Sequence, residues 1–279
     1  KELGLNGKND IEKFGIDKFN NACRESVVRY TKEWREYMRR LGRWVDMDNE
    51  YRTMDLPFME SVWSAVKTLW DKGLLYEGKF VVSYSSALGT TLSNFEASLD
   101  YRDIQDPSLT LKCKLTGNHT GKNLLVWTTT PWTMPANLAV AVDPKGIYAE
   151  VRENSSGEIF YILKSRVESY WPQENSVTIV REFLGSELHG CAYEPFFDCW
   201  KNKANEHCFK VYGTNYVLHD TGTGAVHTAP AFGEDDFGAA KQYGLPVLDH
   251  LDHAGQYLPG NPQEVVGLDF KAGDKWLIS

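Results

Sequence analysis

The 279-residue sequence contains no apolar run near the roughly 20 residues that a membrane-spanning helix needs. Its first residues, Lys1-Glu2-Leu3-Gly4, lack the apolar segment of a signal peptide. The five cysteines are irregularly spaced and include no Cys-x-x-Cys pair, so neither a disulfide framework nor a thiolate zinc site is indicated. Basic residues number only 30 against 38 acidic ones, and the net charge of -8 argues against binding nucleic acid through bulk positive charge. These absences predict a soluble, cytoplasmic protein with no membrane partner.

Residues 1–79 carry the signals of helices and a nearly balanced charge of 15 basic and 14 acidic side chains. Apolar residues recur every three or four positions from about Asp17 to Gly42, which predicts one helix. A second helix is predicted from Pro57 to Lys72, with Asp55 as a capping candidate. Neither helix carries a reactive constellation, so packing is the favoured interpretation.

Residues 80–279 hold 24 acidic side chains against 15 basic ones, and short strand signals replace the helical ones. Turn-forming Gly, Pro, Asn and Asp separate these strands, and the clearest helix runs from Glu234 to Tyr243. The pattern predicts a mixed α/β chain in which a helical segment precedes a β-barrel-like domain with peripheral helices. The predicted strands are Phe80–Tyr84, Leu124–Thr130, Leu138–Val142, Ile159–Leu163, Val177–Arg181, Cys208–Tyr212 and Ala225–Thr228.

The first segment with chemical potential runs from Leu125 to Asn137 and reads Leu-Val-Trp-Thr-Thr-Thr-Pro-Trp-Thr-Met-Pro-Ala-Asn. An apolar strand leads into Thr128, Thr129 and Thr130 and is stopped by Pro131, so hydroxyls and unpaired backbone N–H groups gather at a strand end. Such a cluster suits a carbonyl, a ribose or a water. The structural alternative is that β-branched threonine favours a strand.

The second segment runs from Gly222 to Phe237 and reads Gly-Thr-Gly-Ala-Val-His-Thr-Ala-Pro-Ala-Phe-Gly-Glu-Asp-Asp-Phe. Its pattern predicts His227 at the end of a strand and Asp236 in the first turn of a helix, close enough to line one crevice. A simpler interpretation of the three acids is that they stabilise the positive end of the helix dipole. A simpler interpretation of His227 is that it makes a structural hydrogen bond. The Gly-Thr-Gly turn is a weak nucleotide signal because no P-loop lysine follows.

Together these segments resemble the editing domain inserted in the catalytic core of isoleucyl-tRNA synthetase, a class I enzyme. The related valyl and leucyl enzymes typically carry Thr-Thr-Arg-Pro at the first motif, so Thr-Pro-Trp-Thr at residues 130–133 favours the isoleucyl branch. Residues 42–49, 58–63 and 91–96 are similar to the family's segments leading into the insertion. The resemblance implies that residues 1–79 are a helical segment of the catalytic core and that residues 80–279 are the editing domain.

The sequence also departs from the family. Neither His-x-Gly-His nor Lys-Met-Ser-Lys-Ser is present, so the resemblance implies that ATP and Mg serve the parent synthetase, with no cofactor for the editing fragment. Ser83, Ser85 and Ser86 stand where some relatives have cysteines, and the pair His250 and His253 lacks a third ligand, so no metal is expected. Phe232 stands where many bacterial members carry a second histidine.

The function implied by the resemblance is hydrolysis of the ester of valyl-tRNA(Ile), with the 3′ end of the aminoacylated tRNA and the remainder of the synthetase as partners. By their chemistry, Thr128, Thr129, Thr130 and Asn137 would hold the ester, the ribose hydroxyls and the attacking water. Asp236 would bind the substrate's α-ammonium, a charge-assisted contact. Trp127, Thr133 and His227 would bind the side chain of the substrate, with His227 excluding the extra methyl of isoleucine.

Three alternatives remain at this stage. Valyl- or leucyl-type editing would share the same motifs with another substrate. A non-catalytic module would bind the aminoacylated 3′ end without cleaving it, and a degenerate domain would bind neither. No Gly-x-Ser-x-Gly nucleophile and no general base can be assigned.

Overall fold

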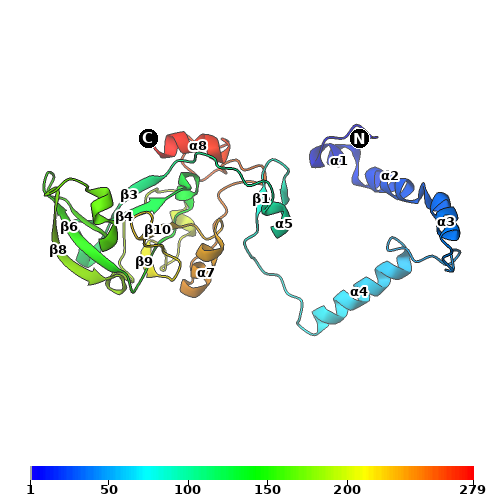
Figure 1. Cartoon of the computed structure of the whole chain (residues 1–279), viewed down its shortest axis with the longest axis horizontal. Coiled ribbons are helices and arrows are strands. Elements are labelled where there is room, and N and C mark those ends of the chain that lie inside the picture. Colours follow the sequence, from blue (N-terminus) through cyan, green and yellow to red (C-terminus); the bar gives the residue numbers. More distant parts are fainter. Residues whose placement is uncertain (1) are drawn as a thin grey trace. The chain divides into compact units, whose positions relative to one another are not determined.

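The computed structural model describes residues 2–279, and the chain divides into two compact units with the boundary between Lys79 and Phe80. At this position the residue pattern of the sequence changes from helical periodicity to short strand signals. No helix among the described residues is both long and apolar enough to cross a membrane. Figure 1 shows the helices of the first unit in blue and cyan, and the sheet of the second unit in green and yellow.

The first unit contains the helices α1 (Lys8–Phe14), α2 (Ile16–Val28), α3 (Thr31–Arg40) and α4 (Leu56–Asp71). The prediction of one helix from Asp17 to Gly42 is therefore wrong, because the chain leaves the helix at Arg29 and Tyr30. The β-branched side chains of Val27, Val28 and Thr31 lower helix propensity there, and the Thr31 hydroxyl binds the Val28 carbonyl.

The α4 prediction is confirmed to within one residue at each end, with Pro57 in its first turn. Asp55 is the N-cap residue, as expected, but its side chain makes no capping hydrogen bond. None of the residues in α2, α3 or α4 is buried.

The second unit is built on one eight-stranded sheet, and Figure 1 shows helices at its periphery. A two-stranded sheet of β1 (Tyr84–Ser85) and β2 (Thr90–Thr91) precedes it. The large sheet comprises β3 (Leu109–Lys114), β4 (Lys122–Thr128), β5 (Ala139–Val142), β6 (Ile147–Glu153), β7 (Ile159–Leu163), β8 (Val177–Leu184), β9 (Lys210–Gly213) and β10 (Ala225–Thr228). The helices are α5 (Asn94–Ala97), α6 (Val167–Tyr170), α7 (Glu234–Tyr243), α8 (Phe270–Leu277) and the 3-10 turns η1 (Gly117–His119), η2 (Pro131–Ala136), η3 (Lys164–Arg166), η4 (Gly185–Leu188) and η5 (Lys201–Lys203).

Most of the predicted strands are confirmed, and β7, β10 and helix α7 match to the residue. The predicted strand Phe80–Tyr84 is wrong, since only Tyr84 pairs with a neighbouring strand. Strands β3 and β6 were not anticipated. In β3, Lys112 and Lys114 alternate with apolar residues, so the strand signal is present there and was overlooked. In β6, Glu150 interrupts the buried run and obscures the pattern.

The sheet curls, which confirms the mixed α/β, barrel-like expectation. Its strand order is β8-β6-β7-β4-β10-β5-β9, and β3 pairs with the other side of β4. Residues Ala192 and Tyr193 then bridge β3 and β9: Tyr193 pairs with Leu115, just after β3, and Ala192 pairs with Lys210 of β9. The curl encloses a core of buried apolar side chains that includes Leu124, Val126, Val140, Tyr148, Tyr161, Leu163, Val211 and Ala225.

One glycine packs so closely on this core that a side chain is excluded. Gly224 lies just before β10 with φ of +80°, and a Cβ there would stand 2.4 Å from Leu163 Cβ. Gly190 has the same φ of +80° but open space around it. The two positions therefore share backbone strain and differ only in the steric clash.

We expect Gly190→Ala to cost about 1 to 2 kcal/mol of unfolding free energy, the cost of a left-handed alanine. Gly224→Ala should cost a further 1 to 3 kcal/mol or so, because the added methyl overpacks the core against Leu163. Urea unfolding of the two variants measures both values. Equal losses of stability would show that Leu163 moves aside and that the clash is relieved.

Candidate functional site

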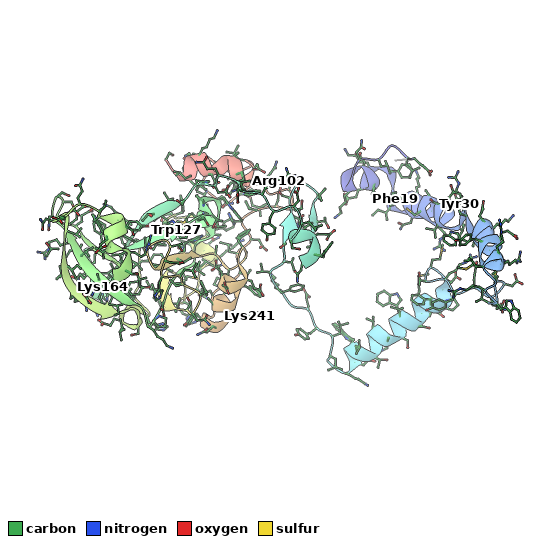
Figure 2. All side chains as sticks on the ribbon, viewed as in Figure 1. Phe19, Tyr30, Arg102, Trp127, Lys164 and Lys241 are labelled. Atoms are coloured by element: carbon green, nitrogen blue, oxygen red, sulfur yellow. The ribbon has the colours of Figure 1, made fainter. Side chains whose placement is uncertain are left out.

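The two segments with chemical potential meet because β4 and β10 are parallel neighbours. Their register pairs Trp127 with Val226, so Thr128 and His227 lie at the same edge of the sheet. β5 runs antiparallel to β10, which places the residues just before Ala139 at that edge as well. Figure 2 marks Trp127 within this second unit. Residues 94 positions apart, Thr133 and His227, come into direct contact there.

A cavity of about 160 Å³ opens at this edge. Seven of the predicted site residues line it, and Asn137 lies directly behind the His227 ring. The lining consists of Trp127, Thr128, Thr129, Thr130, Thr133, Val226, His227, Ala229, Phe232 and Asp236. The structure thus brings together all eight residues predicted to act in catalysis or substrate binding.

The threonines form a hydrogen-bonded cluster around the 3-10 turn that begins at Pro131. The Thr128 hydroxyl accepts from the Thr130 N–H at 3.1 Å, and the Thr133 hydroxyl donates to the Thr130 carbonyl at 2.8 Å. The Thr130 and Thr133 hydroxyls are 3.1 Å apart. Among the described residues Thr129 has no side-chain partner and is exposed, so its hydroxyl is available to a ligand.

His227 is held as a neutral ring with its proton on Nε2. The Asn137 Nδ2 group lies 2.9 Å from the Ala139 carbonyl, which only accepts, and this contact fixes the orientation of the amide. Its second hydrogen therefore points to His227 Nδ1 at 2.9 Å, so Nδ1 is an acceptor. The Nε2–H group donates to the Thr133 hydroxyl at 2.7 Å.

Burial lowers the pKa of His227 to about 3, with a smaller contribution from His250. Since both ring nitrogens are already hydrogen-bonded and the ring is neutral, His227 forms a wall of the cavity. The arrangement leaves neither nitrogen free to act as a general base.

Asp236 supplies the negative charge of the cavity from the third residue of α7. Its carboxylate accepts hydrogen bonds from the Ala229 N–H at 2.9 Å and the Tyr216 hydroxyl at 3.3 Å. Burial raises the pKa of Asp236 to about 6 in spite of these contacts, and Asp235 raises it slightly further. The carboxyl group is therefore anionic at neutral pH, and its ionisation lowers the stability of the folded state. A perturbed pKa of this kind is typical of functional acids.

The sequence reasoning missed Val226, Ala229 and Tyr216, and it treated Phe232 only as a departure from the family. Phe232 lies within the second motif, just before Gly233 and the acids that open α7, and this position could have marked it as a cavity residue. Trp132 does not line this cavity: its ring packs edge-on against Phe232 at 5.2 Å. Trp127 is seated on Gly222, where a Cβ would lie 2.7 Å from the indole.

The two histidines near the C-terminus, His250 and His253, have separate hydrogen-bond partners. His250 is buried, and its Nε2–H donates to the Trp132 carbonyl at 2.9 Å. His253 contributes its backbone carbonyl to the Tyr84 hydroxyl at 2.9 Å. Within residues 2–279, no group of three or more His, Cys, Asp or Glu side chains has the arrangement of a metal site.

Comparison with known proteins gives one family over the whole chain: residues 1–279 match the family model of class I tRNA synthetases (I, L, M and V). The chain is 46% identical to the isoleucine–tRNA ligase of Protochlamydia amoebophila and 42% identical to that of Chlamydia pneumoniae, each over 278 residues. These matches cover 100% of this chain but only 27% and 26% of the relatives, so the chain spans about a quarter of their length. The resemblance indicated by the motifs is confirmed.

Comparison with solved structures matches the chain to the crystal structure of GlLeuRS-CP1, with a TM-score of 0.40 and 18% identity over 50% of this chain and 66% of that chain. Another is the P. falciparum cytosolic leucyl-tRNA synthetase editing domain, with a TM-score of 0.39 and 12% identity over 56% of this chain and 75% of that chain.

Asp236→Asn should raise the free energy of unfolding at neutral pH. Because burial raises the pKa of this carboxyl from 3.8 to about 6, the native state binds the proton more tightly than the unfolded chain. Stability from the protonated form is present below about pH 4 and is lost as the pH rises to about 6. The asparagine variant avoids this loss, so it should be about 1 to 3 kcal/mol more stable than the parent at pH 7.

Asp235→Asn is the matched control, because it removes an exposed charge from the same helical turn. Urea unfolding between about pH 4 and 7 compares the three proteins. A gain for Asp236→Asn that does not grow over this range, or an equal gain for Asp235→Asn, would contradict a buried charge at Asp236.

Proposed function

The chain belongs to the class I tRNA synthetase family of the I, L, M and V type, and on this premise we propose that residues 80–279 are an editing domain. Its reaction is hydrolysis of the ester that joins valine to the terminal adenosine of isoleucine tRNA. The observation that carries the proposal is a single cavity lined by a threonine cluster, a neutral histidine and one half-buried carboxylate.

The need for such a site follows from the limits of binding. One methylene in an apolar pocket is worth only about 1 to 3 kcal/mol, and the choice between isoleucine and valine is the standard illustration of this limit. A second, smaller pocket that admits valine and excludes isoleucine removes the wrong product. With a volume of about 160 Å³, the cavity holds an aminoacyl group and leaves the adenosine outside it.

Each lining group has a role in this reaction. Asp236 binds the α-ammonium, which distinguishes an aminoacyl ester from a simple ester. His227 and Trp127 bound the side-chain pocket together with Thr133, whose hydroxyl accepts from His227 Nε2–H. Thr128, Thr129 and Thr130 hold the ester and the attacking water, and Asn137 supports the site through His227. Because an aminoacyl ester is already activated, water held in place and a polar lining for the developing oxyanion are sufficient.

The remainder of the synthetase is the proposed partner of residues 1–79. Helices α2 to α4 bury no residue of their own, and they expose the large apolar side chains Trp34, Tyr37, Trp63 and Trp70. Exposed apolar surface of this extent is typical of an interface. We assign the use of ATP and Mg²⁺ to that remainder, require no cofactor for the hydrolysis, and place the reaction in the cytoplasm at the 3′ end of the tRNA.

Deacylation of valyl-tRNA(Ile) by this chain tests the proposal. Asp236→Ala should lower kcat/KM roughly 10- to 100-fold, the worth of one hydrogen bond to a charged group. Thr129→Ala should lower it less, since water and neighbouring hydroxyls remain. Asp235→Ala is the control and should keep the parent rate. Hydrolysis at the parent rate by Asp236→Ala would show that Asp236 does not bind the α-ammonium. Binding of valyl-tRNA by the parent chain without cleavage would favour the non-catalytic module.

Replacing His227 should open the pocket to isoleucine. His227→Ala is expected to raise hydrolysis of isoleucyl-tRNA(Ile) roughly 10- to 100-fold, because that range is the discrimination that one methylene supports. His119→Ala serves as the control, since His119 bonds Tyr161 outside the cavity. Continued rejection of isoleucyl-tRNA by His227→Ala would assign the exclusion to another wall, and preferential cleavage of another aminoacyl-tRNA would favour valyl- or leucyl-type editing.

A further inference from the structure

A chain of buried hydrogen bonds continues behind the cavity, beyond the residues that line it. The Tyr193 hydroxyl donates to Asn137 Oδ1 at 2.7 Å. Asn137 Nδ2 then donates to His227 Nδ1 at 2.9 Å, and His227 Nε2 to the Thr133 hydroxyl at 2.7 Å. Tyr193 is 3% exposed and lies 56 residues from Asn137 in sequence.

The direction of this chain is set at both ends of the Asn137 amide. On one side the Ala139 carbonyl accepts only, so it requires the amide nitrogen. On the other side Tyr193 provides a donor to the amide oxygen, and burial raises the pKa of Tyr193 well above its usual value, so the hydroxyl keeps its proton. A flipped amide would oppose two acceptors at Ala139 and present its NH₂ group to the Tyr193 hydroxyl.

Tyr193 is itself fixed in place by the segment that bridges β3 and β9. Its backbone N–H donates to the Phe209 carbonyl at 3.0 Å, and the next residue, Glu194, donates to the Lys114 carbonyl at 2.9 Å. Its ring packs between Phe196 and Phe209, with centroids at 5.9 and 6.2 Å. The hydroxyl is therefore a donor at a fixed point of the barrel.

We propose that Tyr193 is a positioning residue of the cavity: acting through Asn137, it holds the His227 ring in the orientation and Nε2–H form that close the pocket to larger side chains. What the pocket excludes rests on the proposed editing function. The hydrogen-bond chain does not, so the two parts can be tested separately.

The first test needs no substrate. In the 279-residue chain labelled with ¹⁵N-histidine, the ring nitrogens of His227 should show an acceptor Nδ1 and a protonated Nε2. Tyr193→Phe removes only the hydroxyl and should shift both signals toward a mixture of tautomers. Tyr212→Phe is the matched control, because it removes a buried tyrosine hydroxyl bound to the His207 carbonyl and should leave the His227 signals unchanged.

Asn137→Leu provides a second variant, should Tyr193→Phe fold poorly. It removes the amide donor to Nδ1 and should shift the His227 signals at least as far. Parent-like His227 signals in folded Tyr193→Phe or in Asn137→Leu would overturn the proposal, and Tyr193 would then be a core side chain only.

The second test measures specificity. Tyr193→Phe should raise hydrolysis of isoleucyl-tRNA(Ile) about fivefold, the worth of one net hydrogen bond, and change the rate on valyl-tRNA(Ile) much less. Tyr212→Phe should change neither rate. If the parent chain does not cleave valyl-tRNA, the editing function is overturned while the ¹⁵N signals still decide the positioning role. If the parent cleaves it and Tyr193→Phe still rejects isoleucyl-tRNA like the parent, the role of Tyr193 in specificity is overturned.

Discussion

The parallel pairing of β4 and β10 is the constraint on which the rest of the site depends. Parallel strands finish at the same edge of a sheet, so one register pair, Trp127 with Val226, brings two distant motifs together. β5 lies antiparallel to β10, so its beginning, with Asn137, reaches the same edge. A slip of one residue would exchange Val226 and His227 between the two faces of the sheet and remove the histidine from its hydrogen bonds. The buried core on one face of β10 holds the register against such a slip.

The same low-dielectric surroundings act on the two ionisable groups of the cavity with opposite consequences. Burial lowers the pKa of His227 to about 3 and keeps the ring neutral, which suits a wall that meets an apolar side chain. Burial raises the pKa of Asp236 to about 6, so its charge at neutral pH is a strain on the folded state. An incoming ammonium would relieve that strain. The carboxylate therefore gains more from a cationic ligand than an exposed acid would, and the stability lost in the free protein favours binding.

Much of the site was predictable because its signals are local. Glycine turns and alternation delimit β10, the acids and Gly244 delimit α7, and Pro131 ends the threonine strand, so the lining residues follow from short stretches of sequence. Other features depend on distant partners. Glu150 reads as a surface residue, yet it is buried in β6 between Lys122 at 3.0 Å and Arg181 at 2.9 Å. Tyr193 lies in a segment without strand periodicity, and no local pattern connects it with Asn137, 56 residues away.

The location of the cavity also limits what the net negative charge of the chain implies about its ligands. The net charge of -8 opposes a broad grip on phosphate. The cavity lining contains one carboxylate and no lysine or arginine, so its field favours an ammonium group and disfavours a phosphate. On the proposed function, the aminoacylated end of the tRNA satisfies both conditions, since it presents its positive charge first and its phosphates last. The excess of acidic residues then favours binding of the ammonium-bearing end of the substrate. We assign neutralisation of the tRNA phosphates to surfaces outside residues 80–279.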